Sequence, residues 1–117
     1  MMRYVFMVAG LFWVALAVGC AGNPSLRSEA STSAISAAEA VGASEVPRAS
    51  LHLQLAREEL ARAQVLAGKG DKDEAASQLL RAEADAELAV VLSRESDEKT
   101  EAAAAMERVR QLQRDNR

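Results

Sequence analysis

The chain falls into three zones of hydrophobic pattern. An uncharged apolar run fills residues 5–18, a stretch of small and polar residues follows, and from residue 47 onward apolar side chains recur at alternating steps of four and three. Side chains at such steps share one face of an α-helix. The pattern therefore predicts an all-α protein behind an apolar leader.

The first helix is predicted over about residues 48–67. Pro47 precedes it, and proline suits the first turn of a helix because its missing N–H needs no partner there. The predicted seam consists of Ala49, Leu53, Ala56, Leu60, Ala63 and Ala67, widened by Leu51, Leu55 and Leu66. Charged side chains occupy much of the remaining surface, so this helix has two distinct faces.

A polar turn over residues 68–74 separates the two helices. Gly68 or Gly70 can take the left-handed conformation that ends a helix, and Asp71 can cap the next helix, with Glu74 completing a capping box. A short link favours antiparallel neighbours. We therefore expect an antiparallel helical hairpin that resembles a coiled coil.

The second helix is predicted to be long. Its seam consists of Ala75, Leu79, Ala82, Ala86 and Ala89. Residues 93–101 are polar on every side but contain no proline or glycine, and the rhythm resumes from Ala102 to Leu112. We expect one continuous helix over about residues 72–114, with a kink near Ser96 and a short third helix as the alternative.

The two seams leave several large apolar side chains without a place between the helices. We expect these side chains to contact another chain, either a second copy or an envelope protein. The predicted interaction face consists of Leu55, Leu66, Leu80, Leu88, Val91 and Leu92.

Residues 20–46 carry few large apolar side chains. Between Leu26 and Glu45, only Ile35 and Val41 are large and apolar. Two such residues do not offset the cost of ordering the backbone, about 1–2 kcal/mol per residue. We expect a flexible linker over residues 20–46, with transient helix at most, and a helical domain over residues 47–117.

The leader has the features of a secretory signal. Arg3 provides a basic start, and the apolar run that follows would span about 21 Å as a helix, whereas a permanent membrane span takes about 20 residues. We predict a signal peptide over residues 1–19.

The end of the leader resembles the lipobox of bacterial lipoproteins, because small residues 17–19 precede Cys20. The resemblance implies cleavage between Gly19 and Cys20 and acylation of Cys20, for example with palmitate, which would anchor the chain to a membrane. Since aspartate does not follow the cysteine, it also implies the periplasmic side of the outer membrane. An ordinary signal peptide cut near Ala21 or Gly22, and an uncleaved anchor, are the alternatives.

Composition narrows the possible functions once the leader is removed. Every aromatic residue lies within the first 13 positions, and beyond residue 19 the chain carries 13 basic and 17 acidic side chains. An acidic chain without aromatic residues is a poor candidate for nucleic-acid binding. An alanine-rich domain of this size buries little apolar area, so we expect it to rely on self-association or on a partner.

No catalytic or metal site is predicted. His52 is the only histidine and has no ligand neighbours in sequence, while Glu83 and Glu87 are read as a solvated helix face. The acidic residues Asp97, Glu98 and Glu101 lack the glycine turn of a calcium loop. We expect a non-enzyme without a cofactor, apart from the covalent lipid on Cys20.

Residues 51–91 resemble the helical domain of a family of bacterial envelope lipoproteins, domain of unknown function 4398. The resemblance is carried by Leu-Ala-Arg-Glu-Glu-Leu-Ala-Arg-Ala-Gln (55–64), Gly-Asp (70–71) and Glu-Ala-Ala-Ser-Gln-Leu-Leu-Arg-Ala-Glu-Ala-Asp-Ala-Glu-Leu-Ala (74–89). It implies an envelope location and a helical hairpin, but no site residues. The same span also resembles half of a tetratricopeptide repeat, a minor alternative because solenoids need about three repeats.

The sequence thus favours a lipid-anchored structural or interaction protein of the cell envelope. It would self-associate or dock to another envelope component through its apolar helix face. One alternative is a peptidoglycan-associated tether resembling the murein lipoproteins, although those end in lysine and this chain ends in Asn116-Arg117. The other is an adaptor subunit of a larger complex.

Overall fold

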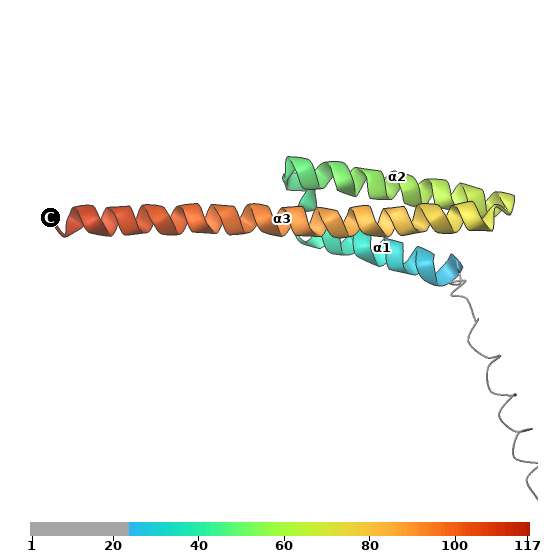
Figure 1. Cartoon of the computed structure of the whole chain (residues 1–117), viewed down its shortest axis with the longest axis horizontal. Helices are drawn as coiled ribbons and strands as arrows, with labels where there is room; N and C mark the ends of the chain where they lie inside the picture. The colour runs from blue at the N-terminus through green and yellow to red at the C-terminus, as the bar shows by residue number, and fades with distance from the viewer. Residues whose placement is uncertain (1–23) are drawn as a thin grey trace, which may run out of the picture.

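The computed structural model describes residues 24–117, with side chains from Arg27 onward, and over this range it is entirely helical (Figure 1). The elements are α1 (Pro24–Ala40), a single 3-10 turn η1 (Ala43–Glu45), α2 (Pro47–Lys69) and α3 (Lys72–Asp115). No strand occurs among the described residues. The predicted all-α class is confirmed.

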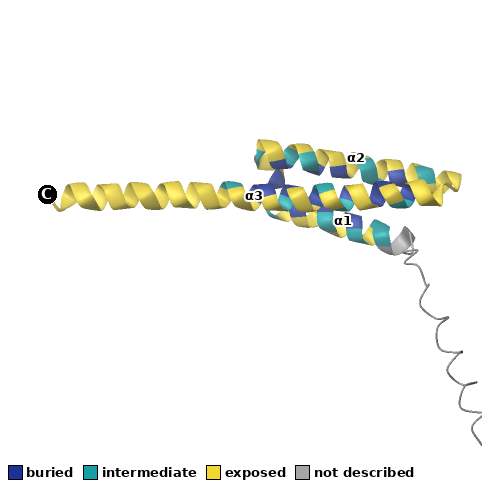
Figure 2. Ribbon diagram, in the orientation of Figure 1, coloured by how far each residue is buried: buried dark blue, intermediate teal, exposed yellow. Residues whose placement is uncertain are grey.

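The three helices form a short bundle from which one helix projects. In Figure 1, α1 and α2 lie on either side of the first half of α3, with α2 antiparallel to both of the others. We call α1, η1, α2 and residues 72–96 of α3 the body, and residues 97–115 the projecting half. Every residue from Asp97 to the C-terminus is exposed (Figure 2).

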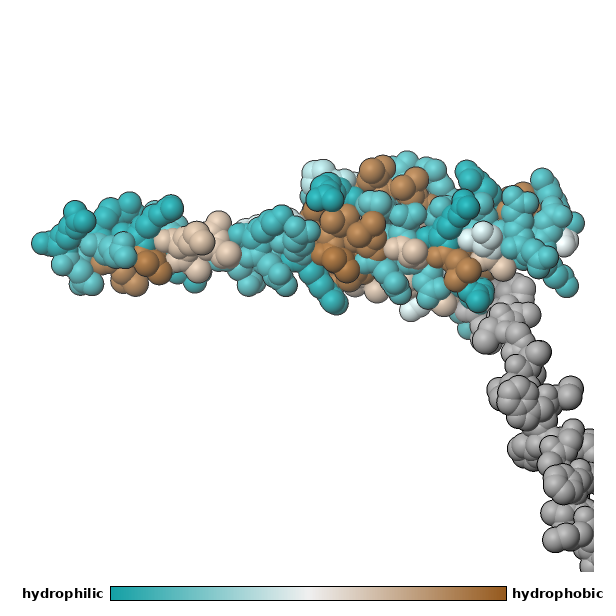
Figure 3. All heavy atoms as spheres, viewed as in Figure 1, coloured by the Kyte–Doolittle hydropathy of each residue, from teal (hydrophilic) through white to brown (hydrophobic). Residues whose placement is uncertain are grey.

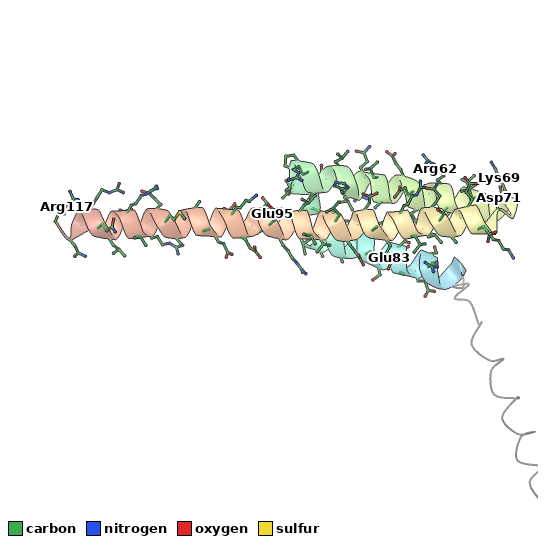
Figure 4. The ribbon with its side chains drawn as sticks, viewed as in Figure 1. Arg62, Lys69, Asp71, Glu83, Glu95 and Arg117 are labelled. Carbon is green, nitrogen blue, oxygen red and sulfur yellow. The ribbon has the colours of Figure 1, made fainter. Side chains whose placement is uncertain are left out.

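The turn between α2 and α3 forms as the glycine pattern predicts. Gly70 has φ +89°, and its N–H donates to the carbonyl oxygen of Ala67, while the Asp71 N–H donates to that of Leu66. These two bonds satisfy carbonyl groups that the end of α2 leaves free. Asp71 occupies the N-cap of α3, but its side chain makes no capping hydrogen bond. Figure 4 labels Lys69 and Asp71 at this end of the body.

The seam between α2 and α3 is built almost entirely from alanine. The predicted positions of both helices are buried, except that Leu60 is half-buried and Ala67 is exposed: Ala49, Leu53, Ala56, Ala63, Ala75, Leu79, Ala82, Ala86 and Ala89. Small side chains let two helix backbones approach closely, which gains van der Waals contact where alanine buries little area. Leu53 is the largest of the fully buried side chains among the described residues.

The prediction of a flexible linker over residues 20–46 is wrong for its described part, because Pro24–Ala40 forms α1 and packs on α3. This segment has few large apolar side chains, but α1 packs with small ones as well and buries Ser31, Ile35 and Ala38. The Ser31 hydroxyl lies 2.9 Å from two carbonyl oxygens, that of Leu79 on α3 and that of Arg27 in its own helix, so its proton is shared between them. Close packing and hydrogen bonds between helices offset the ordering entropy, and the helical domain begins at Pro24 rather than at residue 47.

A second buried serine fixes the other end of α1. The hydroxyl of Ser93, on α3, donates to the carbonyl oxygen of Val41 at 2.7 Å, just after α1 ends. The chain then reverses at Gly42, which has φ +73°. The two serine contacts join α1 to α3 near the middle of α1 and just after its C-terminal end.

The predicted continuity of α3 is confirmed. It runs for 44 residues, about 66 Å at 1.5 Å per residue, without a break near Ser96. A polar stretch without proline or glycine does not interrupt a helix, because the backbone hydrogen bonds continue through it.

Candidate functional site

The predicted interaction face is divided between surface and core. Leu55, Leu80, Leu88 and Val91 are exposed and Leu66 is half-buried, whereas Leu92 is 8% exposed. Leu92 therefore does not belong to a free face. It packs in the core cluster that contains Ile35 and Ala43, both from the segment predicted to be a linker. Once α1 covers α3, the side chain of Leu92 points into the bundle.

A longer apolar surface follows the outer side of α3. We call it the outer stripe, and it steps by three and four residues along both halves of the helix: Ala84, Leu88, Val91, Glu95, Glu98, Ala102, Ala105, Val109 and Leu112. Every member is exposed, including Val91 at 58%, Val109 at 53% and Leu112 at 62%. Repeats of three and four on one helix are the pattern of a coiled-coil seam. The outer stripe is thus a helix-pairing face that nothing in the described chain covers.

Hydrophobic side chains gather at two places in the view of Figure 3. One group lies over α2 and α3 at the end of the body where α3 emerges, and another lies near the tip of the projecting half. Between them lie a hydrophilic stretch next to the body, where residues 93–101 are found, and a weakly hydrophobic stretch nearer the tip. Figure 4 labels Glu95 at this point of α3 and Arg117 at its tip.

A groove runs between α1 and α3 beside the outer stripe. It measures about 580 Å³ and is lined by Ala30, Ser33, Ala34, Ala37, Glu83, Glu87, Val90 and Val91. Its floor consists of small and apolar side chains, with Glu83 and Glu87 contributing carboxylates. Glu83 is half-buried and Glu87 is exposed, so the predicted solvated face here borders a concave surface. Val91 belongs to both the groove and the outer stripe.

Packing of α2 on α3 forms a polar cluster that the sequence did not reveal. His52 Nδ1 lies 2.7 Å from Asp85 Oδ1, and both side chains are about a quarter exposed. Glu59 lies two helical turns further along α2. Its Oε2 atom is buried without a hydrogen-bond partner among the described residues. His52 and Asp85 are 33 positions apart in the sequence, and only the antiparallel register of α2 on α3 would have predicted their contact.

Glu59 is the residue of this cluster whose ionisation is disfavoured by folding. Burial raises the pKa of Glu59 above its usual value of 4.5, and the nearby negative charge of Asp85 raises it further. Arg81 and Arg62 act in the opposite direction with smaller effect. The folded state therefore binds a proton on Glu59 more readily than the unfolded chain does.

We predict that Glu59→Gln makes the fold more stable at neutral pH. A carboxyl whose pKa is raised by folding costs nothing below pH 4.5, but the cost develops as pH rises through its folded pKa. Glutamine removes that cost, so urea midpoints should be higher than those of the unmodified chain at pH 7 and equal at pH 4. Glu58→Gln, on the exposed neighbour, is the control. A lower midpoint for Glu59→Gln at pH 7 would contradict this account.

One local ion pair joins the end of the body to the start of the projecting half. Lys99 Nζ lies 2.6 Å from Glu95 Oε1, and the hydrogen bond from Lys99 lowers the pKa of the Glu95 carboxyl. Asp97, Glu98 and Glu101 are all exposed. Within residues 24–117, no three histidine, cysteine, aspartate or glutamate side chains come together as a metal site.

The predicted attachment site lies outside the described residues. Gly19, Cys20 and the whole predicted signal peptide precede Pro24, where the description begins. Of the helices that are described, none combines the length and the apolar character that crossing a bilayer requires.

The comparisons with known proteins give one positive result. The family described as Domain of unknown function (DUF4398) matches residues 28–114. The match begins within α1 and ends at the tip of α3, so the family's domain corresponds to the helical chain and not only to the α2–α3 pair. No curated protein and no solved structure matches the chain. Because the match covers most of its length, this chain belongs to the DUF4398 family.

Proposed function

We propose that this protein is a non-catalytic, lipid-anchored interaction or structural lipoprotein of the bacterial cell envelope. It acts through the outer stripe of α3, by self-association or by docking to another envelope component. The observation that carries the proposal is the projecting half, a helix of 19 residues with every side chain exposed and apolar residues at Val109 and Leu112.

A helix in this position is suited to binding. Isolated helices of fewer than about 12–15 residues are marginal in water, and longer ones gain most of their stability from packing an apolar face. The projecting half continues the helical hydrogen bonds of α3 but has nothing in the described chain to pack against. A partner along the outer stripe would supply that packing.

The position of α1 limits how far an anchor on Cys20 would hold the body from the membrane. Pro24 lies four residues after Cys20, at the end of the body that is opposite to the tip of the projecting half (Figure 1). Four residues span at most about 14 Å. A lipid on Cys20 would therefore hold the body close to the membrane surface, which differs from the long stand-off that a linker of residues 20–46 implies.

We predict that Cys20→Ser abolishes fatty-acid labelling and leaves unprocessed precursor. Acylation needs the thiol, and a bacterial lipoprotein signal is cut only at the modified cysteine. Labelling cells with a radioactive or clickable fatty acid, followed by immunoprecipitation, measures both effects. Ser25→Ala, close to the proposed cleavage position, is the control and should label normally. Unchanged labelling of the Cys20→Ser chain would refute the lipid anchor.

A further inference from the structure

We propose that the partner on the outer stripe is a second copy of this chain, bound antiparallel, so that the projecting half of each copy lies along the body of the other. The inference rests on the proposed function and specifies one of its forms. It follows from the lengths of the two halves of α3, from the order of residues along the stripe and from the place where the body ends.

The two halves of α3 have similar lengths. The body covers residues 72–96, about 37 Å of helix, and the projecting half adds residues 97–115, about 29 Å. A two-fold axis beside Thr100 places the projecting half of one copy along the body of the other. Both copies then use the same surface, as a closed two-fold dimer requires.

The residues along the outer stripe match in this arrangement. Large apolar side chains face each other near both ends, and each glutamate faces an alanine of the other copy. The pairs are Leu88 with Leu112, Val91 with Val109, Glu95 with Ala105, and Glu98 with Ala102. These are the contacts between unlike seam positions that antiparallel coiled coils form.

A parallel pairing in the same register is disfavoured by charge. It would place Glu95 against Glu95 and Glu98 against Glu98 across the seam, and facing like charges are destabilising. The antiparallel pairing separates these carboxylates by facing each with a methyl group. Alanine also leaves room for the glutamate side chain to extend toward water.

The outer stripe is polar in its middle because the body ends there. Residues after Ser96 have no α1 or α2 beside them, so the centre of the dimer contains only the two α3 helices. Glu95 and Glu98 fall at this centre, where their carboxylates stay in water. The apolar residues of the outer stripe lie on either side of this centre, where each copy contacts the body of the other. The hydrophilic gap between the two apolar groups in Figure 3 coincides with the centre.

The proposed contact reaches from Leu88 to the end of the body. Leu112 of the second copy would meet Leu88, and Met106, which is 61% exposed, would lie near the end of the body. The groove beside Val91 borders the same contact on the side of α1.

The size of the contact is adequate for a specific dimer. Residues 88–112 extend for about 37 Å, and a strip one to two helix diameters of about 10 Å wide covers roughly 370–740 Å² on each copy as a flat projection. A ridged helix surface has more accessible area than its projection. The contact thus approaches the roughly 800 Å² per partner that is typical of stable interfaces.

Charges beside the seam predict a response to salt. Arg94 of one copy lies within one helical turn of Arg108 of the other on the same side of the seam, and Glu101 lies within one turn of its own counterpart. Exposed like charges are screened by salt. Raising the salt concentration should therefore tighten the dimer, whereas it weakens an association held by opposite charges.

Disulfide trapping tests the pairing on the full chain, with Cys20→Ser as the background. Leu88→Cys and Leu112→Cys chains are prepared separately, mixed in mild detergent and oxidised. Residues 88 and 112 of one helix are about 36 Å apart, so a link between them can only join two copies. The mixture should give at least roughly ten-fold more linked dimer than either chain alone, joined through positions 88 and 112. Circular dichroism verifies that both variants remain helical.

Gln111→Cys is the matched control, since it is exposed on the same turn but lies off the outer stripe. Mixed with the Leu88→Cys chain, it should give little linked dimer. A link between two copies of position 112 in the Leu112→Cys chain alone would overturn the antiparallel arrangement and leave self-association intact. No link in any mixture, together with a monomeric chain, would overturn both the pairing and the self-association in the proposed function.

Discussion

Replacing Leu53 with alanine should remove much of the body's stability. Leu53 is 1% exposed and is the largest side chain that the described core buries completely, among neighbours that are mostly alanine. Truncating a buried leucine costs about 2–5 kcal/mol, because apolar burial is lost and a cavity remains. A domain of this size has a total stability of only about 5–15 kcal/mol, and one built on alanine should lie near the lower end.

Urea unfolding followed by circular dichroism measures this effect, since all aromatic residues lie in the predicted signal and leave no fluorescent probe in the domain. Val65→Ala is the control, because Val65 lies on the same helix and is 56% exposed. It should change the unfolding free energy by less than about 0.5 kcal/mol. Equal urea midpoints for Leu53→Ala and Val65→Ala would show that the alanine seam does not hold the body together.

Replacing Leu112 with aspartate should dissociate the self-associated chain without unfolding it. Leu112 is 62% exposed in the single chain, so the substitution removes no contact within the body. In a two-fold dimer it removes two buried leucines, each contributing about 1.5–3 kcal/mol, and introduces two charges at an apolar contact. The dissociation constant should rise by more than about 100-fold.

Gln111→Asp provides the matched control for this variant. It introduces the same charge at an exposed position one residue away, outside the outer stripe. Concentration-dependent sedimentation should be lost in the Leu112→Asp chain and retained in the Gln111→Asp chain. Equal loss in both variants would mean that net charge, rather than the stripe, controls association.

The helices α2 and α3 and the seam between them could be predicted from the sequence alone. Their boundaries fall within two residues of the prediction, and Gly70 adopts the left-handed conformation expected at the end of α2. The reason is local: the four-three rhythm and the glycine turn are properties of short segments, and a short link leaves antiparallel packing as the simplest outcome.

The helix α1 could not be predicted from the sequence, because its packing depends on small residues and on contacts with α3, which is distant in the sequence. Ser31, Ile35 and Ala38 do follow the four-three rhythm, but a serine on a seam reads as polar until its hydroxyl has an acceptor. One acceptor, the carbonyl of Arg27, is local, but the one that joins α1 to α3 is the carbonyl of Leu79, 48 residues away. The same omission placed Leu92 on a free face, since nothing was expected to cover it.

The polar cluster was missed for a related reason. His52 and Asp85 lie on different helices, and their contact depends on the axial register of α2 against α3. Hydrophobic periodicity gives the face that each helix buries but gives the register only roughly. By contrast, Leu88 and Val91 were placed on the interaction face from the sequence. Residues 102–112 were predicted only to continue the helical rhythm, and the structure shows that they extend the same exposed face along α3.

Self-association through the outer stripe of α3 can be measured by sedimentation velocity of the full chain with Cys20→Ser, in mild detergent over a hundred-fold range of concentration. We expect a shift from monomer to dimer with rising concentration, at a lower concentration in higher salt, and its loss in the Leu112→Asp chain. A monomer throughout the range, or association that Leu112→Asp leaves unchanged, would show that the outer stripe does not join two copies.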